Sequence, residues 1–391
     1  MNTRALCLVL AAMSMAGCAN FSGLDTQGQR LDANTLQTGK SLTGVTLSSA
    51  AWPSADWWKS LGDPQLDGLI QEALQNSPDM QVASARAHQA EAAAYAANAA
   101  RMPTLDASAG VSRSRLAKDQ DPLGQGDAYS TVRNIGASFN YNFDLWGGQR
   151  AAWEAALGQA RAAEVDQQAA RLTLAADVAK AYSDLGQAHI VRDLANDDLK
   201  RTRQMLNLSQ RRLNSGIDSQ YQFQQTESLE ASSQSQLIDA EKQLQSAKIA
   251  LAVLLGKGPD RGNELARPAV LKPSAVAVPS VLPAELLGRR PDLIAARWRV
   301  EAASKNIAAG KANFYPNLNL SASAGAESLL GDAMFGSASR FFNIAPTISL
   351  PIFDGGRLRA NLDARDADYD LAVAQYNKKI GRASCRERVY G

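Results

Sequence analysis

Few side chains in this 391-residue chain have the types and spacing that covalent chemistry would require. Its two histidines, His88 and His189, lie in segments expected to be helical, where a packing or surface role is the simpler interpretation. No serine–histidine–aspartate grouping suggests itself. With 3 cysteines and 2 histidines, a disulfide framework or a Cys/His metal cluster is excluded in practice. The sequence therefore gives no positive evidence for an enzyme, and it assigns no catalytic, cofactor-binding or metal-binding residue.

Paired carboxylates and clustered tryptophans are the other side chains that could take part in catalysis or ligand binding. Carboxylate pairs can serve acid–base catalysis, but on helices they are usually solvated, and we expect these pairs on solvent-facing surfaces. Tryptophans can bind carbohydrate, yet we favour packing of an extended N-terminal arm onto helices. The carboxylates are Asp197, Asp198, Asp363 and Asp366, and the tryptophans are Trp52, Trp57 and Trp58.

One thiol, Cys18, lies where modification is expected. Residues 1–17 have a short basic start, an apolar run and small residues at the end, which is the pattern of a secretory signal peptide. The string Met15-Ala16-Gly17-Cys18 resembles a bacterial lipobox, in which the cysteine is lipidated and becomes the first residue of the mature chain. Cleavage beside a merely exposed cysteine is the alternative. Ala19 is not the aspartate that resembles an inner-membrane retention signal, so an outer-membrane destination is favoured.

Charge and hydropathy exclude two further classes of protein. The 41 basic and 39 acidic residues leave a net charge of +2, which gives no general attraction to nucleic acid. No run approaches the roughly 18 apolar residues that a transmembrane helix needs. A membrane would have to be reached in another way.

An internal repeat organises the chain. Ser77-Pro78-Asp79-Met80 aligns with Arg290-Pro291-Asp292-Leu293 at an offset of 213, and the same offset pairs Pro103 with Pro316. Proline followed by aspartate favours a helix start, and the second proline ends the helix and begins an extended segment. Each copy is therefore expected to open with a helix that leads into a strand.

Four segments alternate between apolar and polar side chains, with the period of two typical of β-strands. Strands of about 10 residues with this pattern are typical of an outer-membrane barrel wall, although half-buried hairpins of a soluble sandwich show the same alternation. Four strands cannot close a barrel, because the smallest have about 8. A barrel would need two chains for eight strands or three for twelve, and the sequence does not choose. The expected strands cover about residues 103–116, 130–146, 316–327 and 341–354.

Long helices are expected between the two copies. Residues 148–213 contain no proline, and heptads of small residues and leucines indicate a coiled coil. A break at 214–219 and a second helix to residue 255 make a long helical hairpin. The expected organisation is a signal peptide (1–17), a lipid-anchored extended arm (18–63), a first repeat (64–256, with its hairpin at 148–256), a Pro-rich connector (257–283), an incomplete second repeat (284–380) and a non-native tail (381–391).

The tail is assigned on two observations. The first hairpin maps at an offset near 208 onto positions that extend to about 464, beyond residue 391. The helical pattern holds through Leu358, Leu362, Tyr369 and Tyr376 and then fails at 381–391. The second hairpin tip is therefore expected to be missing.

Together these residues resemble the TolC-like outer-membrane efflux family, in its lipoprotein branch. The resemblance implies an α+β membrane protein with an internal two-fold repeat of long coiled-coil helical hairpins and two β-hairpins. Their four strands would contribute to a 12-stranded outer-membrane β-barrel shared by a homotrimer. The matching motifs are Trp57-Trp58, Gly62-Asp63-Pro64-Gln65-Leu66, Ala73-Leu74-Gln75-Asn76-Ser77-Pro78, Phe143-Asp144-Leu145-Trp146-Gly147, Gly288-Arg289-Arg290-Pro291-Asp292-Leu293 and the run Leu350 to Leu358.

The resemblance also implies a function and partners. It implies a passive duct, lipid-anchored in the bacterial outer membrane and extending into the periplasm. The duct would carry drugs or other small molecules from an inner-membrane pump, RND-type, through a periplasmic adaptor. The alternative is a non-conducting structural or adhesive outer-membrane lipoprotein.

The hairpin tip is the docking site that the resemblance implies. In the family this tip meets the adaptor, and the alternative here is a loop that only closes the hairpin. Gly216 would permit the turn, Ile217 would offer an apolar contact and Arg212 a polar one. The implied docking residues are Arg212, Leu213, Gly216, Ile217 and Ser219.

Overall fold

The described part of the chain forms two compact units in the computed structural model. We call them the strand unit (Met1–Thr35, His88–Ala162 and Leu293–Arg386) and the hairpin unit (Leu36–Ala87, Ala163–Asp292 and Glu387–Gly391). The signal peptide and Cys18 lie outside the described residues. Those residues are 21, 23–31, 47–48, 56–115, 129–269, 278–279, 290–328 and 334–386.

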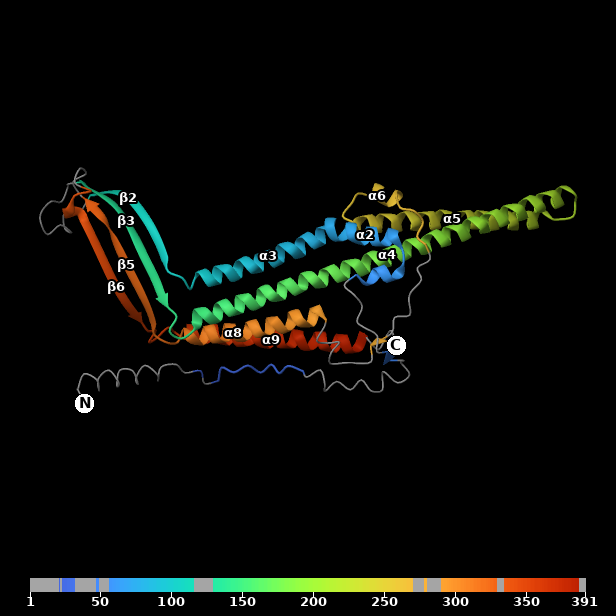
Figure 1. The fold of residues 1–391 in the computed structure, drawn as a ribbon. Helices are drawn as coiled ribbons and strands as arrows, with labels where there is room; N and C mark the ends of the chain where they lie inside the picture. Colours follow the sequence, from blue (N-terminus) through green and yellow to red (C-terminus); the bar gives the residue numbers. More distant parts are fainter. Residues whose placement is uncertain are drawn as a thin grey trace. The chain divides into compact units, whose positions relative to one another are not determined.

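The strand unit contains a four-stranded antiparallel sheet in the order β2-β3-β5-β6 (Figure 1). Each expected β-hairpin forms, and the central pairing of β3 with β5 joins the two copies of the repeat. The strands are β2 (Thr104–Arg115), β3 (Tyr129–Phe143), β5 (Asn317–Ser328) and β6 (Arg340–Ser349).

Two of the strands end earlier than the alternation predicted. β3 stops at residue 143 instead of 146, and β6 stops at 349 instead of 354. In both places an aspartate caps the following helix. Asp144 accepts hydrogen bonds from the backbone N–H groups of Gln149 (3.0 Å) and Arg150 (2.8 Å), and Asp354 accepts one from Leu358 N–H (2.9 Å). Each cap requires a turn, so the strand ends there although apolar and polar residues continue to alternate in the sequence.

Helices α8 (Pro291–Ala312) and α9 (Arg357–Arg386) run side by side in the strand unit (Figure 1). Small residues allow close approach: a Cβ at Gly310 of α8 would lie 3.4 Å from Leu362 Cδ1 of α9. On another side of α8, a Cβ at Gly158, in the helix Gly148–Asn214, would lie 3.1 Å from Ala302 Cβ. Helix α9 continues to Arg386, six residues past the expected boundary at 380. The expected loss of helical pattern in the tail is therefore wrong for residues 381–386.

The hairpin unit has its own core. The 3-10 helix η2 (Trp57–Leu61) and helix α2 (Pro64–Asn76) pack against helices α4 (Gly148–Asn214) and α5 (Gln220–Leu254). Trp58 is only 2% exposed, so packing is confirmed for it, although in a short helix and not in an extended arm. Trp52 lies outside the described residues. The core consists of Trp58, Leu66, Leu69, Ile70, Ala73, Leu174, Ala175, Val178, Ala179, Tyr182, Leu185, Leu251 and Leu255.

A buried hydrogen-bond network secures this core. The Tyr182 hydroxyl donates to Asp63 Oδ2 at 2.7 Å, and Asp63 Oδ1 caps α2 by accepting from the backbone N–H of Gln65 at 2.9 Å. Burial, together with the adjacent Asp63 carboxylate, raises the pKa of the Tyr182 hydroxyl. One aspartate thus joins the start of α2 to the middle of α4.

The α4–α5 hairpin confirms the heptad prediction. Leucines and small residues at the heptad positions are buried, as Leu185, Leu199 and Thr202 are, or half-buried, as Leu206 is. Arg192 occupies a heptad position that is otherwise taken by leucine or valine; it is half-buried and pairs with Asp193 at 3.0 Å. No described helix combines the length and the low charge that a membrane span would require.

The connector differs from the expected extended segment. It contains the short helix α6 (Asp260–Asn263) and the strand β4 (Val278–Pro279), which pairs in parallel with β1 (Leu47–Ser48). Arg261 holds α6 against α2 through an ion pair with Glu72 at 2.9 Å. Proline content predicted an extended chain, but the Arg261–Glu72 ion pair and the pairing of β4 with β1 order short pieces of it.

Candidate functional site

A glycine-ended turn forms the hairpin tip. Gly216 has φ +72°, and its N–H bonds to Leu213 O at 2.9 Å. The next N–H, that of Ile217, bonds to Arg212 O at 2.9 Å. This pair of bonds is a Schellman motif, which satisfies the last carbonyls of α4 and requires the left-handed residue that glycine provides. The predicted role of Gly216 in the turn is confirmed.

Arg212 holds the tip in shape. Its Nε lies 2.9 Å from Asp218 Oδ1 and its terminal nitrogen also lies 2.9 Å from that oxygen. Ser219 then caps α5 through a reciprocal capping box with Gln222. Arg212 and Ser219 therefore have partners within the tip, where the sequence interpretation placed them toward another protein. The Ser-x-x-Gln spacing could have identified the capping box in advance, whereas nothing in the sequence marked Asp218.

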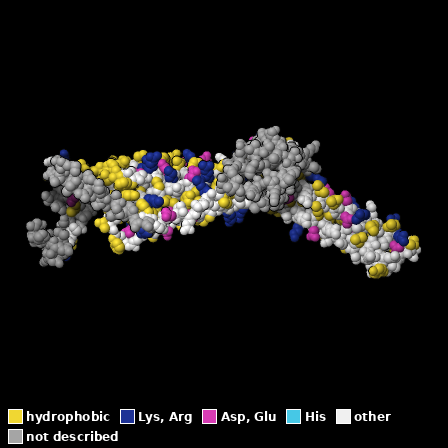
Figure 2. Space-filling view, turned by 90° about the horizontal axis from the view of Figure 1, so that it is seen from below, with side chains coloured by type: hydrophobic (Ala, Val, Ile, Leu, Met, Phe, Trp, Pro, Cys, Tyr) yellow, Lys and Arg dark blue, Asp and Glu magenta, His cyan; other side chains and the backbone are white. Residues whose placement is uncertain are grey.

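The apolar surface at the tip comes from two side chains. Ile217 is 64% exposed, whereas the residue at this position of a Schellman motif commonly packs back on the helix. Tyr221, the second residue of α5, is 74% exposed and was not identified from the sequence. Leu213 is half-buried. Hydrophobic side chains lie at the end of the hairpin in Figure 2, on its right.

The sheet in the strand unit has one apolar face. The strand register places alternate residues of all four strands on this face. Leu105 lies opposite Phe139, Phe139 opposite Ala322, and Ala322 opposite Ile344. Several large members of this face are exposed, among them Ile344 at 67% and Phe342 at 83%. Its members are Leu105, Ala107, Ala109, Val111, Ile135, Ala137, Phe139, Tyr141, Phe143, Leu318, Leu320, Ala322, Ala324, Phe342, Ile344 and Ile348.

The opposite face of the sheet is mostly polar. Serine, asparagine and threonine predominate, as in Ser138, Asn140 and Ser321. Phe341 is an aromatic residue on this face, and its ring lies over glycines: a Cβ on Gly325 would come 3.1 Å from Phe341 Cε1. Val132 of β3 is on this face as well. The two faces match the alternation predicted from the sequence.

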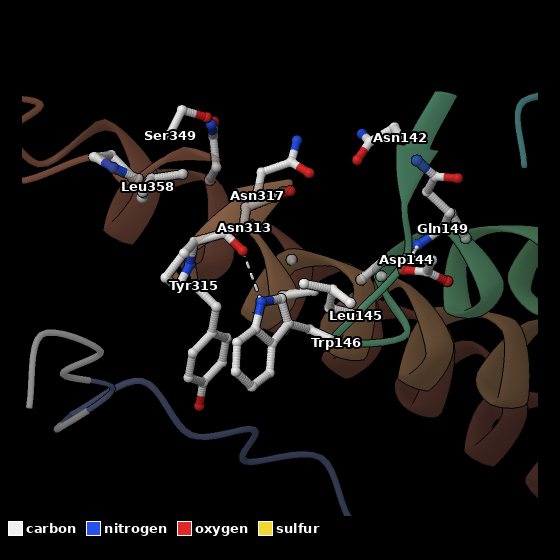
Figure 3. A pocket seen from close by; sticks show the side chains of 18 of the residues that line it. Asn142, Asp144, Leu145, Trp146, Gln149, Asn313, Tyr315, Asn317, Ser349 and Leu358 are labelled. Carbon is white, nitrogen blue, oxygen red and sulfur yellow. Dashed lines mark hydrogen bonds between the residues drawn. The ribbon is translucent and has the colours of Figure 1, made fainter. Parts of the chain in front are cut away.

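A cavity of about 880 Å³ lies where strands pass into helices in the strand unit (Figure 3). The Trp146 ring stacks on Tyr315 with centroids 4.7 Å apart, and its indole N–H donates to Pro316 O at 2.7 Å. Side-chain amides such as Asn142 and Asn313 and apolar side chains such as Leu145 and Leu358 line the rest of it. The walls of the cavity are therefore mixed, and the described residues contain no group of three or more His, Cys, Asp or Glu that could hold a metal.

One carboxylate departs from the solvated position that its sequence predicted. Asp366 on α9 is 5% exposed, and its Oδ2 has no hydrogen-bond partner. Burial raises the pKa of its carboxyl, with Asp363, Asp370 and Asp25 adding and Lys311 opposing. The solvated interpretation is wrong for Asp366, because α9 turns this residue toward its neighbours, and it holds for exposed Asp363.

His88 is exposed, and burial with nearby cations lowers the pKa of His189.

A helix-rich chain with a sheet of one apolar and one polar face has the architecture of an outer-membrane channel protomer. The sequence profile of the outer membrane efflux protein family matches residues 69–257 and 282–384. The chain belongs to this family, which consists of efflux channels and not of enzymes.

Individual relatives agree with this assignment. The fusaric acid resistance protein FusA of Burkholderia cepacia is 36% identical over 97% of this chain and 74% of its own. The multidrug resistance outer membrane protein MdtP of Escherichia coli (strain K12) is 31% identical over 96% of this chain and 78% of its own. The crystal structure of the outer membrane protein VceC from Vibrio cholerae gives a TM-score of 0.76 at 35% identity, covering 85% of this chain and 79% of that chain. The chain is therefore an outer-membrane efflux protein.

Proposed function

We propose that three copies of this chain form a passive exit duct in the bacterial outer membrane, anchored by lipid on Cys18. The observation that carries the proposal is the four-stranded sheet, whose strand register gathers exposed apolar residues on one face and polar residues on the other. An RND-type inner-membrane pump would deliver drugs or other small molecules through a periplasmic adaptor. The energy for transport would come from that pump.

Closure of the sheet is the physical reason for the oligomer. Strands β2 and β6 form its two edges, and lipid cannot satisfy the free N–H and C=O groups of an open edge. Pairing β6 of one copy with β2 of the next removes every edge. Three copies of four strands give twelve, with the apolar face toward lipid and the polar face toward the lumen.

Conductance and cross-linking test the duct together. Purified protein added to a planar bilayer is expected to give discrete conductance steps. Cysteine pairs that scan the two edges, Asn343→Cys with Ser108→Cys or Gly110→Cys, should cross-link copies into a covalent trimer. Asn140→Cys in the central strand β3 is the matched control and should not. Edge cross-links without conductance would favour the structural or adhesive lipoprotein.

We propose that the exposed tip, centred on Ile217, docks the adaptor. An apolar side chain that is 64% exposed on a loop fixed by the Arg212–Asp218 pair is a preorganised contact. Ile217→Asp should reduce adaptor cross-linking in cells at least about tenfold, since burying a charge in an apolar contact is costly. Arg212→Ala should have a smaller effect, because it loosens the turn.

The control for the tip is Ile238→Asp, an equal change at a residue of α5 that is 56% exposed and away from the tip. Adaptor capture should survive it. Loss of capture in both variants would mean that any added charge disrupts assembly, and unchanged capture with Ile217→Asp would remove the tip from the docking site.

The anchor has its own test. Cells grown with labelled fatty acid should label the protein, and Cys18→Ser should abolish the label. Label that persists in that variant would refute lipidation at Cys18.

A further inference from the structure

The apolar face of the sheet carries charge only at one end. In antiparallel strands without bulges, alternate residues share a face. Arg113 therefore lies on the face of Val111, Arg133 on the face of Ile135, and Arg340 on the face of Phe342. All three lie toward the loops that join the strands, as does Arg115 at the end of β2 on the same face, whereas the helices meet the opposite ends (Figure 1).

These arginines are neighbours in the sheet. Arg113 pairs in register with Thr131, two residues from Arg133, so the two arginines are diagonal neighbours about 7–8 Å apart. Arg340 lies opposite Ala326, which lies opposite Ile135. From the spacings of strands and residues, Arg340 and Arg133 are about 12 Å apart. Long side chains from these positions can converge on one multivalent anion.

The cluster has no acidic counterpart on its face. Among the described strand residues, the only carboxylates are Asp106 and Glu327, and both lie on the polar face. The Arg113 guanidinium lies 4.8 Å from the ring centroid of Tyr129, which orients it without neutralising it. Arg133 and Arg340 have no ion-pair partner in the ranges that the structure describes.

The position matches the level of lipid headgroups. The apolar rows run from Phe143 to Ile135, eight residues or about 27 Å of strand, which becomes about 21 Å across the membrane at a tilt near 40°. Arg133 lies in the next row, just beyond the hydrocarbon. Guanidinium groups at this level bind phosphate through paired hydrogen bonds.

We propose that Arg113, Arg133 and Arg340 form a binding site for the phosphate groups of the lipid leaflet at the loop end of the barrel. This inference rests on the proposed duct, because the barrel gives the sheet its orientation in the membrane. The occupant is a phosphate-bearing lipid and not a protein, since the arginines continue directly from the lipid-facing apolar rows. The ligand would fasten the barrel at that surface.

The test measures thermal unfolding of the whole protein in phosphatidylcholine vesicles that contain increasing fractions of lipid A. The unfolding midpoint should rise by roughly 5 °C, because a ligand that binds only the folded state stabilises it. Chemically dephosphorylated lipid A should give little rise. The triple variant Arg113→Gln, Arg133→Gln and Arg340→Gln should lose the rise. The control variant Arg150→Gln, Arg201→Gln and Arg297→Gln removes the same charge from helices and should keep it.

The outcomes separate the possibilities. Equal rises in the wild type and the triple variant would overturn the proposal, as would equal rises with and without lipid phosphate. A rise produced by inorganic phosphate in detergent, without lipid, would make the cluster a simple anion site and would also overturn it. Conductance of the same wild-type sample tests the duct separately: a conducting protein without a lipid A response refutes only this inference, and a non-conducting one refutes the duct.

Discussion

Helices α3 (Pro78–Ala99) and α8 (Pro291–Ala312) are the same element in two copies of the repeat, yet their surroundings differ. Both have 22 residues and start at a Pro-Asp pair 213 residues apart. Helix α8 buries Leu293, Val300 and four alanines, whereas α3 buries only Ala94. The repeated residues determine the helix, and the neighbouring elements determine which of its faces is covered.

The neighbours of α8 within the strand unit explain its burial. Gly158 of α4 brings the two backbones close at Ala302, and Arg161 of α4 lies over the Trp298 ring at 4.8 Å. Helix α3 instead exposes Val82 (47%) and Tyr95 (69%). These two residues lie on different sides of α3, 13 residues apart. In the proposed trimer, helices of another copy would cover the exposed apolar residues of α3, whereas α8 is packed by its own chain.

The largest expected effect concerns strands β2 and β5, which are also equivalent elements of the two repeat copies. Gly325 of β5 corresponds to Ser112 of β2 at the same offset, but a Cβ at Gly325 would lie 2.3 Å from Ile135 O. Gly325→Ser should therefore destabilise the sheet by about 3 kcal/mol, because the central strands must move apart. Ser112→Gly on the edge strand should cost well under 1 kcal/mol by comparison. Guanidinium unfolding followed by tryptophan fluorescence measures both, and equal losses would refute the predicted difference between strands.

The next effect compares the helices directly. Val300→Ala should cost about 2 kcal/mol, since Val300 is 2% exposed and its loss leaves a cavity. Val82→Ala should be nearly neutral in dissociated protein and should weaken the assembled protein. Unfolding midpoints measured with and without dissociating detergent separate the two cases. If Val82→Ala left the assembled protein unchanged, α3 would have no partner from another copy.

A smaller effect concerns charge on the buried side of α9. Because burial raises the Asp366 pKa, the folded chain retains a proton at pH values where the unfolded chain has lost it, and stability falls as pH rises through that window. Asp366→Asn should therefore add on the order of 1 kcal/mol at neutral pH. The gain should vanish below the ordinary aspartate range, near pH ~3.9. Asp363→Asn, at an exposed site, should add nothing, and a gain that persists in acid would indicate packing instead of charge.

The elements that could be predicted from sequence are those with a period. Alternation in 135–143 and the heptads near Leu185 predicted a strand and a coiled coil, and both are confirmed. Single contacts could not be predicted, because they depend on distant residues. The pairing of Arg212 with Asp218 and the burial of Asp366 are set by a tight turn and by helix packing, neither of which leaves a periodic signal.

The smallest expected effect sharpens the difference between α3 and α8. Lys305 of α8 lies 2.7 Å from Glu154 of α4, while its counterpart in α3 is Ala92. The hydrogen bond from Lys305, followed by that from Arg150, lowers the pKa of the Glu154 carboxyl. Because the Glu154 pKa is lower in the folded chain than in the unfolded chain, this pair stabilises the folded chain at pH values above the ordinary glutamate range. That stability is lost as the pH falls through the lowered pKa of the folded chain.

Lys305→Gln should therefore cost about 0.5 kcal/mol at neutral pH, the usual size for a partly exposed pair, and nothing in acid. The Glu154→Gln variant should make Lys305→Gln neutral at every pH, which a double-mutant cycle of guanidinium unfolding measures. Ala92→Lys should not stabilise α3 in dissociated protein. A pH-independent cost of Lys305→Gln would mean that its aliphatic stem, and not its charge, holds α8 against α4.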